Sequence, residues 1–537
     1  MAGSAHVPPD DFHVYDTTLR DGAQGEGMSL SVNDKLAIAR HLDDLGVGFI
    51  EGGWPGANPK DAEFFRRART ELELSTAQLT AFGSTRRPGG DAATDLAHLR
   101  ESGVGVVTLV AKADVRHVER ALRTTREENL AMVRDSVAHL RGEGQRVFLD
   151  AEHFFDGYVA DPAYALRVLT VAAEAGADVL ALCDTNGGML PYRLAEIVAA
   201  VVGTGLRIGI HAHNDAACAV ANSLAAIDAG ATHVQGTANG YGERSGNADL
   251  FSVVAALEMK VDRRVLPAGR LVELGRVAHA VAEVANITPD PRQPWVGASA
   301  FAHKAGLHVS AIKADPDLYQ HIDPAAVGND MRLLVSELAG RATIELKGRE
   351  IGLEPDADTV LRVIERVKDL ESVGYSFEAA EASFELLLRE EMGERPQFFS
   401  LESWRVIVER RGADARVGDS GGDVFSEATV KLNAKGERIV ATGEGNGPVN
   451  ALDNALRSAL ETMYPGLARL DLVDYKVRIV SGEHGTDAVT RVLVETSDGV
   501  HEWDTVGVHE NVIQASWQAL EEAYTTGLMR QGIEPER

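Results

Sequence analysis

The chain has 537 residues, which exceeds the size of one ordinary domain, so we expect two or three domains. Hydrophobic residues make up 45% of the chain and charged residues 25%, the balance of a folded globular protein. With 53 Lys and Arg against 81 Asp and Glu, the formal net charge is −28, which argues against nucleic acid or an anionic membrane as a partner.

The N-terminal segment predicts no targeting signal. Residues 1–11 have neither the basic nor the apolar region of a signal peptide, and no stretch has the roughly 20 apolar residues that a membrane helix needs. Cys183 and Cys218 lie in apolar surroundings and are expected to be reduced thiols. We therefore expect a cytoplasmic protein.

Eight short apolar runs alternate with longer segments of helical periodicity over the first half of the chain. In one of these segments, Leu36, Ile38, Ala39 and Leu42 follow the spacing of one helix face. Strands that alternate with helices in this way are typical of a (β/α)8 TIM barrel, which we assign to residues 1–285. The expected strands are 12–19, 47–54, 79–85, 105–112, 147–155, 178–185, 206–214 and 232–240.

The barrel pattern stops at a proline-rich stretch, residues 289–294. The segment that follows, 286–399, has the pattern of a mixed, mainly helical extension, with helices expected at 355–370 and 377–391. We interpret this segment as a linker subdomain that covers the active site of the barrel.

The C-terminal segment, residues 400–537, contains an internal near-repeat. Its halves, 428–461 and 490–524, each have the pattern of a β-hairpin, a glycine-containing turn and an amphipathic helix that opens at an asparagine. Two such ββα units predict a pseudo-symmetric α+β domain. The helix N-termini at the two turns suit a carboxylate ligand, but a purely structural role in dimerisation explains the repeat equally well.

Polar residues gather where the expected barrel strands end, which is where barrel enzymes hold their chemistry. His211 and His213 are two residues apart in the seventh strand, so both imidazoles point to one face. With the carboxylate of Asp21, which follows the first strand, they predict a divalent-metal site. Two histidines that are merely hydrogen-bonded in a polar strand end are the alternative. Arg20 ends a buried strand, where it can polarise a carbonyl or hold a carboxylate, and a surface ion pair fits that position poorly.

Several long motifs resemble those of the 2-isopropylmalate, homocitrate and citramalate synthases. The motifs are DTTLRDGAQGEG at 16–27, LALCDTNGGMLP at 180–191, the run from IHAHN at 210–214 to GERSGN at 242–247, and FAHKAGLHVSA at 301–311. In addition, GEGNGPVNALDNAL at 443–456 resembles the C-terminal regulatory domain of the same enzymes. The resemblance implies a metal-dependent acyltransferase that condenses acetyl-CoA with a 2-oxo acid.

The resemblance also implies roles for individual residues. It implies that Asp21, His211, His213 and Asn247 are metal ligands, that Arg20 contacts the keto oxygen, that Gln24 and Thr185 bind substrate, and that Glu152, His308 and Tyr319 take part in catalysis. The expected metal is Mg, Mn or Zn. The extension of one subunit commonly covers the barrel of its partner in this family, which implies a homodimer. The residues alone do not decide whether His308 or Glu152 is the general base that deprotonates acetyl-CoA.

The second expected strand continues as EGGWPGANP, 51–59, which resembles one branch of the citramalate synthases. This resemblance implies that the 2-oxo acid is pyruvate and that isoleucine is the effector of the C-terminal domain. A bulky Trp54 near the strand end would shrink the pocket to the size of a methyl group, unless it packs under the following helix and never meets the substrate. The alternatives are 2-isopropylmalate or homocitrate synthesis, a related metal-dependent acyl-CoA lyase, and an amino-acid sensor without activity.

Overall fold

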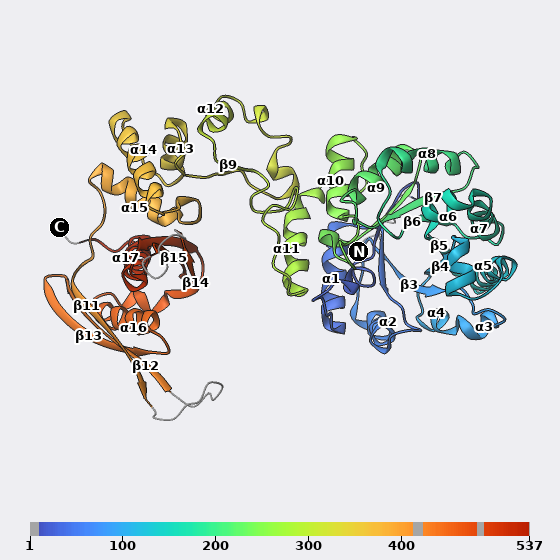
Figure 1. Cartoon of the computed structure of the whole chain (residues 1–537), viewed down its shortest axis with the longest axis horizontal. Coiled ribbons are helices and arrows are strands. Elements are labelled where there is room, and N and C mark those ends of the chain that lie inside the picture. The colour runs from blue at the N-terminus through green and yellow to red at the C-terminus, as the bar shows by residue number, and fades with distance from the viewer. Residues whose placement is uncertain (1–9, 412–422, 481–487, 536–537) are drawn as a thin grey trace, which may run out of the picture. The chain divides into compact units, whose positions relative to one another are not determined.

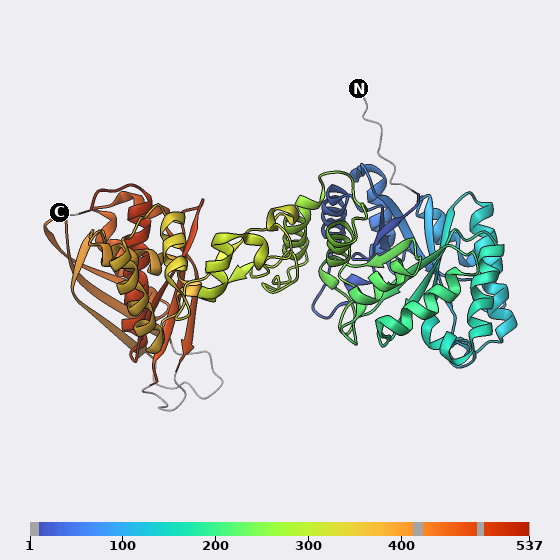
Figure 2. The ribbon, with the colours of Figure 1, turned by 90° about the horizontal axis from the view of Figure 1, so that it is seen from above.

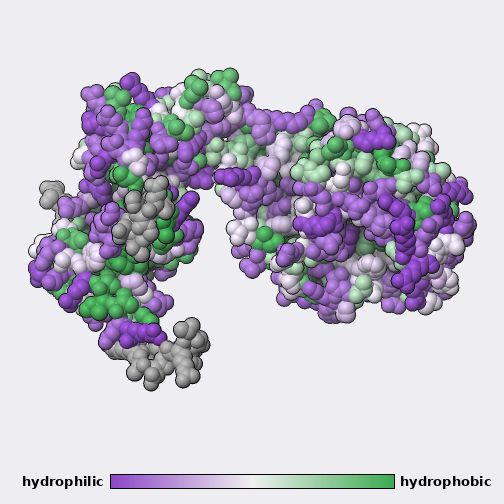
Figure 3. Space-filling view, viewed as in Figure 1, coloured by the Kyte–Doolittle hydropathy of each residue, from purple (hydrophilic) through white to green (hydrophobic). Residues whose placement is uncertain are grey.

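The computed structural model describes residues 10–411, 423–480 and 488–535. The chain divides into two compact units, of which the first comprises Met1–Phe301 with Ile322–Asp330 and the second comprises Ala302–His321 with Met331–Arg537. The first unit runs from blue to green in Figure 1. No helix of the described residues is long and apolar enough to cross a membrane, and the face drawn in Figure 3 intersperses hydrophilic with hydrophobic residues over the barrel.

The first unit is a closed barrel of eight parallel strands in the order β1 to β8, with helices around the outside (Figures 1 and 2). All eight expected strands are confirmed, and so is the TIM-barrel fold. The strands are β1 (His13–Asp16), β2 (Phe49–Gly53), β3 (Gln78–Ser84), β4 (Val106–Lys112), β5 (Arg146–Glu152), β6 (Val179–Asp184), β7 (Ile208–Ala212) and β8 (His233–Gly236).

The barrel helices begin and end at the signals that their sequences carry. Helix α1 begins at a capping box between Ser31 and Asp34 and ends at Gly46, whose φ of 97° favours glycine. Its predicted apolar face, which includes Leu36 and Leu42, is buried against the strands. The helices are α1 (Val32–Leu45), α2 (Pro59–Glu71), α3 (Ala92–Asp95), α4 (Ala97–Glu101), α5 (Arg126–Gly142), α6 (Phe154–Ala160), α7 (Pro162–Glu174), α8 (Pro191–Val202), α9 (Ala219–Asp228), α10 (Leu250–Lys260) and α11 (Leu274–Val284).

The inside of the barrel changes from aromatic to polar along the strands. Near the strand starts, Tyr15, Phe49 and Phe148 pack against one another, with ring centroids 5.3 to 6.1 Å apart. Glu51 and Asp150 follow two residues later on β2 and β5 and point to the same interior because side chains alternate along a strand. The aromatic layer closes one end of the barrel and leaves polar side chains toward the carboxyl ends of the strands.

The second unit begins with the mainly helical segment. It contains the short strands β9 (Ala302–His303) and β10 (Arg332–Leu333) and the helices α12 (Gly306–Ala314), α13 (Arg341–Glu350), α14 (Ala357–Ser372) and α15 (Glu381–Met392). The helices expected at 355–370 and 377–391 correspond to α14 and α15. Helix α15 begins four residues later than expected because Phe377–Ala379 form a separate 3-10 helix and Ala380 is not helical, with φ −151° and ψ 62°.

The C-terminal repeat is present and is longer than its sequence indicated. Each half is a three-stranded antiparallel sheet with one helix packed on it, because a strand precedes each expected hairpin. The halves are β11 (Phe399–Arg411), β12 (Asp423–Ala434), β13 (Glu437–Gly445) with α16 (Pro448–Glu461), and β14 (Asp471–Ile479), β15 (Thr490–Ser497), β16 (Glu502–His509) with α17 (Val512–Arg530). Asn511 caps α17 as expected, whereas α16 begins after Gly447.

Candidate active site

A cavity of about 420 Å³ lies at the carboxyl ends of the barrel strands. It collects seven of the ten residues singled out in the sequence. Its polar lining includes Arg20, Asp21, Gln24, Lys112, Asp150, Glu152, Cys183, Thr185, His211, His213, Glu243 and Arg244, and its apolar lining includes Trp54 and Phe82. Asn247 adjoins this group because its backbone pairs with that of His213.

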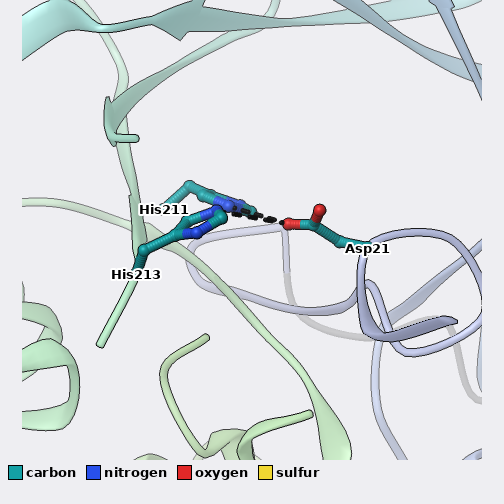
Figure 4. Close-up of side chains that lie close together, drawn as sticks. All are labelled: Asp21, His211 and His213. Carbon is teal, nitrogen blue, oxygen red and sulfur yellow. Dashed lines mark ion pairs between the residues drawn. The ribbon is translucent and has the colours of Figure 1, made fainter. Parts of the chain in front are cut away.

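Three buried side chains converge at the floor of the cavity (Figure 4). The Nε2 atoms of His211 and His213 lie 3.1 and 3.6 Å from Oδ2 of Asp21. His211 lies on β7 and His213 directly after the end of β7, and Asp21 reaches both imidazoles from the turn after β1. Two imidazoles and a carboxylate oxygen on one centre are a ligand set for a divalent cation.

Two buried oxygens test whether a cation fits. Asp21 Oδ2 and Asn247 Oδ1 are buried and accept no hydrogen bond from any described residue. Unsatisfied buried acceptors are costly, and a cation would satisfy them. One contact must change on metal binding. Arg244 Nη2 donates to His213 Nδ1 at 2.9 Å, which leaves the ring proton on Nε2, so ligation through Nε2 requires Arg244 to release this nitrogen. With that change, the residues fit a divalent metal.

Neighbouring charges set the ionisation of the site. Burial alone would raise the pKa of Asp21, but the Arg20 guanidinium and the two imidazoles hold it well below its usual range, so the Asp21 carboxyl group is an anion. Burial raises the pKa of Asp150 to about 7, and the Glu51 carboxylate adds to this rise. Burial also raises the pKa of Cys183 well above its usual range, so this cavity residue is a neutral thiol and a poor metal ligand.

Arg20 is held rigidly beside the cluster. Its Nε donates to Glu51 Oε2 at 2.6 Å, its Nη1 lies 3.1 Å from Asp21 Oδ1, and its Cζ lies 3.9 Å from the centre of the Phe82 ring. The other Glu51 oxygen accepts from the Tyr15 hydroxyl at 2.7 Å. The sequence reasoning missed Glu51, although a carboxylate inside a buried apolar strand is a signal that could have found it.

Glu152 and Thr185 line the cavity from β5 and from the turn after β6. Glu152 forms an ion pair with Lys112, a partner that the sequence reasoning did not identify. Thr185 Oγ1 accepts from the backbone N–H of His153 at 2.8 Å, so its own proton is available to a ligand. These residues offer a cation, an anion and a hydroxyl donor to a small polar substrate.

His308 and Tyr319 belong to the second unit. The structure brings these two together, with ring centroids 4.2 Å apart and nearly parallel planes. Tyr319 and the neighbouring Leu307 and Leu318 are exposed on this unit, at 42%, 77% and 61%. Their part in the site therefore remains a prediction.

Comparisons with known proteins cover nearly the whole chain. The HMGL-like family model matches residues 11–281, the homocitrate synthase post-HMGL domain-like model matches 295–374, and the LeuA allosteric (dimerisation) domain matches 378–528. A protein of Streptomyces coelicolor named (R)-citramalate synthase is 66% identical over 532 residues, covering 98% of each chain. A protein of the same name from Synechocystis sp. is 48% identical, covering 96% of each chain. Another from Aquifex aeolicus is 47% identical, covering 97% of this chain and 98% of the relative. The chain therefore belongs to the HMGL-like family, together with these full-length relatives.

Proposed function

We propose that this protein is an (R)-citramalate synthase, which condenses acetyl-CoA with pyruvate and hydrolyses the thioester to give (R)-citramalate and CoA. The observation that carries the proposal is the cluster of Asp21, His211 and His213 beside Arg20, in a chain that is 66% identical over its full length to a protein of that name. The place of this reaction would be isoleucine biosynthesis.

Different cavity residues would bind the metal and the pyruvate. Asp21, His211, His213 and Asn247 would hold the divalent metal, which when bound supplies a Lewis acid for the carboxylate and keto oxygen of pyruvate. Arg20 donates to the keto oxygen and stabilises the negative charge that develops there. Thr185 and Gln24 bind the substrate carboxylate. Mg, Mn and Zn all suit imidazole and oxygen ligands.

The second substrate must lose a methyl proton. We assign His308 as the base, with Tyr319 and Glu152 as its partners, and infer that the extension brings His308 and Tyr319 to the barrel of the partner subunit in a homodimer. The acetyl enolate then forms a carbon–carbon bond to the keto carbon, the resulting alkoxide takes up a proton to become the hydroxyl group, and water cleaves the thioester to release CoA. The ion pair with Lys112 holds the Glu152 carboxylate in place, which favours an orienting role for Glu152.

The segments outside the barrel are assigned by the same resemblance. We propose three domains, a catalytic barrel at 1–285, an extension at 286–399 and a regulatory domain at 400–537 that binds isoleucine. The match of a LeuA allosteric (dimerisation) domain to 378–528 supports the regulatory and dimeric parts of this proposal. Cys183 and Cys218 are free thiols in the structure, as is usual in the cytoplasm, where we place the enzyme.

The proposal is tested by measuring CoA release with a thiol reagent. The full-length protein is given acetyl-CoA, Mg²⁺ or Mn²⁺, and in turn pyruvate, 2-oxobutyrate, 2-oxoisovalerate and 2-oxoglutarate. We expect a strong preference for pyruvate. A preference for 2-oxoisovalerate would move the enzyme to 2-isopropylmalate synthesis, and no release with any acid would contradict the condensation.

Trp54 is expected to limit the size of the 2-oxo acid. Its ring lines the cavity and meets the Phe82 ring edge-on at 5.4 Å, while its backbone N–H is held by Asp61 of α2 at 2.9 Å. In a Trp54→Ala variant we expect the kcat/KM ratio of 2-oxobutyrate to pyruvate to rise by about 10- to 100-fold, since one methylene is worth about 1–3 kcal/mol. Trp54→Phe is the matched control and should shift the ratio less. An unchanged ratio in Trp54→Ala would show that Trp54 does not line the alkyl pocket.

A further inference from the structure

A buried chain of hydrogen bonds leads away from the metal cluster into the barrel interior. Gln235 on β8 lies between His211 on β7 and Asp150 on β5, and all three side chains are at most 5% exposed. Gln235 Oε1 lies 2.8 Å from His211 Nδ1, and Gln235 Nε2 lies 2.8 Å from Asp150 Oδ1. None of the roles assigned above uses Gln235 or Asp150.

The donors and acceptors of these groups determine the direction of the hydrogen bonds from His211 to Asp150. Gln235 Nε2 donates to Asp150 Oδ1, so the amide nitrogen faces this carboxyl group. The same amide nitrogen lies 3.2 Å from His233 Nε2. The amide oxygen is thereby turned toward His211, whose Nδ1 must carry the hydrogen. In the neutral imidazole that binds a metal, the lone pair of His211 is then on Nε2, the nitrogen that lies 3.1 Å from Asp21 Oδ2.

We propose that Gln235 and Asp150 are positioning residues that hold His211 in the tautomer required of a metal ligand. This inference rests on the metal site of the proposed function and deepens it. A ligating histidine usually donates its other ring N–H to a carboxylate or carbonyl, and loss of that partner weakens metal binding by about 10- to 100-fold. Here the direct partner of His211 is the amide of Gln235, and the carboxylate of Asp150 fixes the orientation of that amide.

Asp150 supplies a carboxylate and Gln235 an amide. Holding His211 requires only that residue 235 accept a hydrogen bond from its Nδ1, so the carboxylate and the amide can be exchanged. If residue 235 became the carboxylate and residue 150 the amide, residue 235 would still accept from His211 Nδ1, and the amide at 150 would donate to it. The double variant Asp150→Asn/Gln235→Glu therefore keeps the direction of every bond toward His211. Gln235→Leu keeps the side-chain size approximately and removes the acceptor.

The test is calorimetric titration of the full-length protein with Mn²⁺ alone at pH 8, without substrates. We expect Gln235→Leu to raise the Kd for Mn²⁺ by about 10- to 100-fold and the double variant to stay within about threefold of the parent. Gln145→Leu is the matched control, because Gln145 is also buried but donates to backbone carbonyls of Leu99 and Val104 behind the barrel strands, and its Kd should not change. Circular dichroism checks that each variant is folded.

The possible failures are distinguishable. A folded Gln235→Leu protein that binds Mn²⁺ like the parent would overturn the positioning role, as would a double variant that loses as much affinity as Gln235→Leu. A parent protein that binds no Mn²⁺ would overturn the metal site itself and this inference with it. Normal Mn²⁺ binding by the parent without any citramalate formation would contradict the proposed function alone.

Discussion

Asp21→Asn is expected to abolish metal binding and almost all turnover. Oδ2 of Asp21 is the anionic atom that both imidazoles face, and the substitution keeps its shape while removing its charge. A metal that binds and polarises a carbonyl supplies several kcal/mol to the transition state. A loss of about 4 kcal/mol lowers kcat by about a factor of a thousand. CoA release with pyruvate measures turnover, and calorimetric titration with Mn²⁺ measures binding.

The control for this variant is Asp228→Asn, which changes an exposed carboxylate at the end of α9. It should leave both Mn²⁺ binding and kcat within about twofold of the parent, since isolated surface charges contribute little. If Asp21→Asn bound Mn²⁺ and turned over normally, the cluster would not be the metal site, and the converging side chains would have only a structural role.

The barrel and part of its site were accessible from sequence because each rests on a local pattern. The strand runs are short, apolar and separated by helical periodicity. This alternation predicts a parallel α/β sheet, and eight strand–helix units in a row are typical of a barrel. The pair His211 and His213 shares a face because side chains alternate along any strand. Asp21 lies close to these histidines because all strands of a parallel barrel end at one rim.

The partners that hold these residues were missed because they come from distant parts of the chain. Glu51 reaches Arg20 from the neighbouring strand, and Gln235 reaches Asp150 across the barrel interior. Such contacts depend on the register of barrel closure, which no local spacing encodes. The edge strands β11 and β14 were missed for a different reason. Much of β14 is exposed, so it has no clear alternation of buried and exposed positions, and the reasoning began each repeat at its hairpin.

Replacing Arg20 is expected to separate catalysis from metal binding. The guanidinium is fixed by Glu51, Asp21 and Phe82, so it can stabilise a developing alkoxide without reorganising. In Arg20→Ala we expect kcat to fall by about 100- to 1000-fold, the usual cost of losing one preorganised donor. Arg20→Lys should recover little of this loss, because an ammonium cannot reproduce both the planar fork and the stacking on Phe82. Both variants should still bind Mn²⁺, since they keep Asp21, His211 and His213 and change only the Arg20 contact to Asp21 Oδ1.

Arg146 offers a matched control at the opposite end of the barrel. It lies at the start of β5, its Cζ is 5.1 Å from the Phe148 ring centre, and it pairs with Asp178, so it resembles Arg20 in its contacts but not in its position. Arg146→Lys should lower the melting temperature and leave kcat within about twofold of the parent. If Arg146→Lys and Arg20→Lys lost activity equally, the loss would come from a general destabilisation of the barrel and not from a missing donor at the substrate. A loss confined to Arg20, with Mn²⁺ still bound, would place its guanidinium at the reacting carbonyl, because only a donor used in the transition state changes kcat without changing the metal.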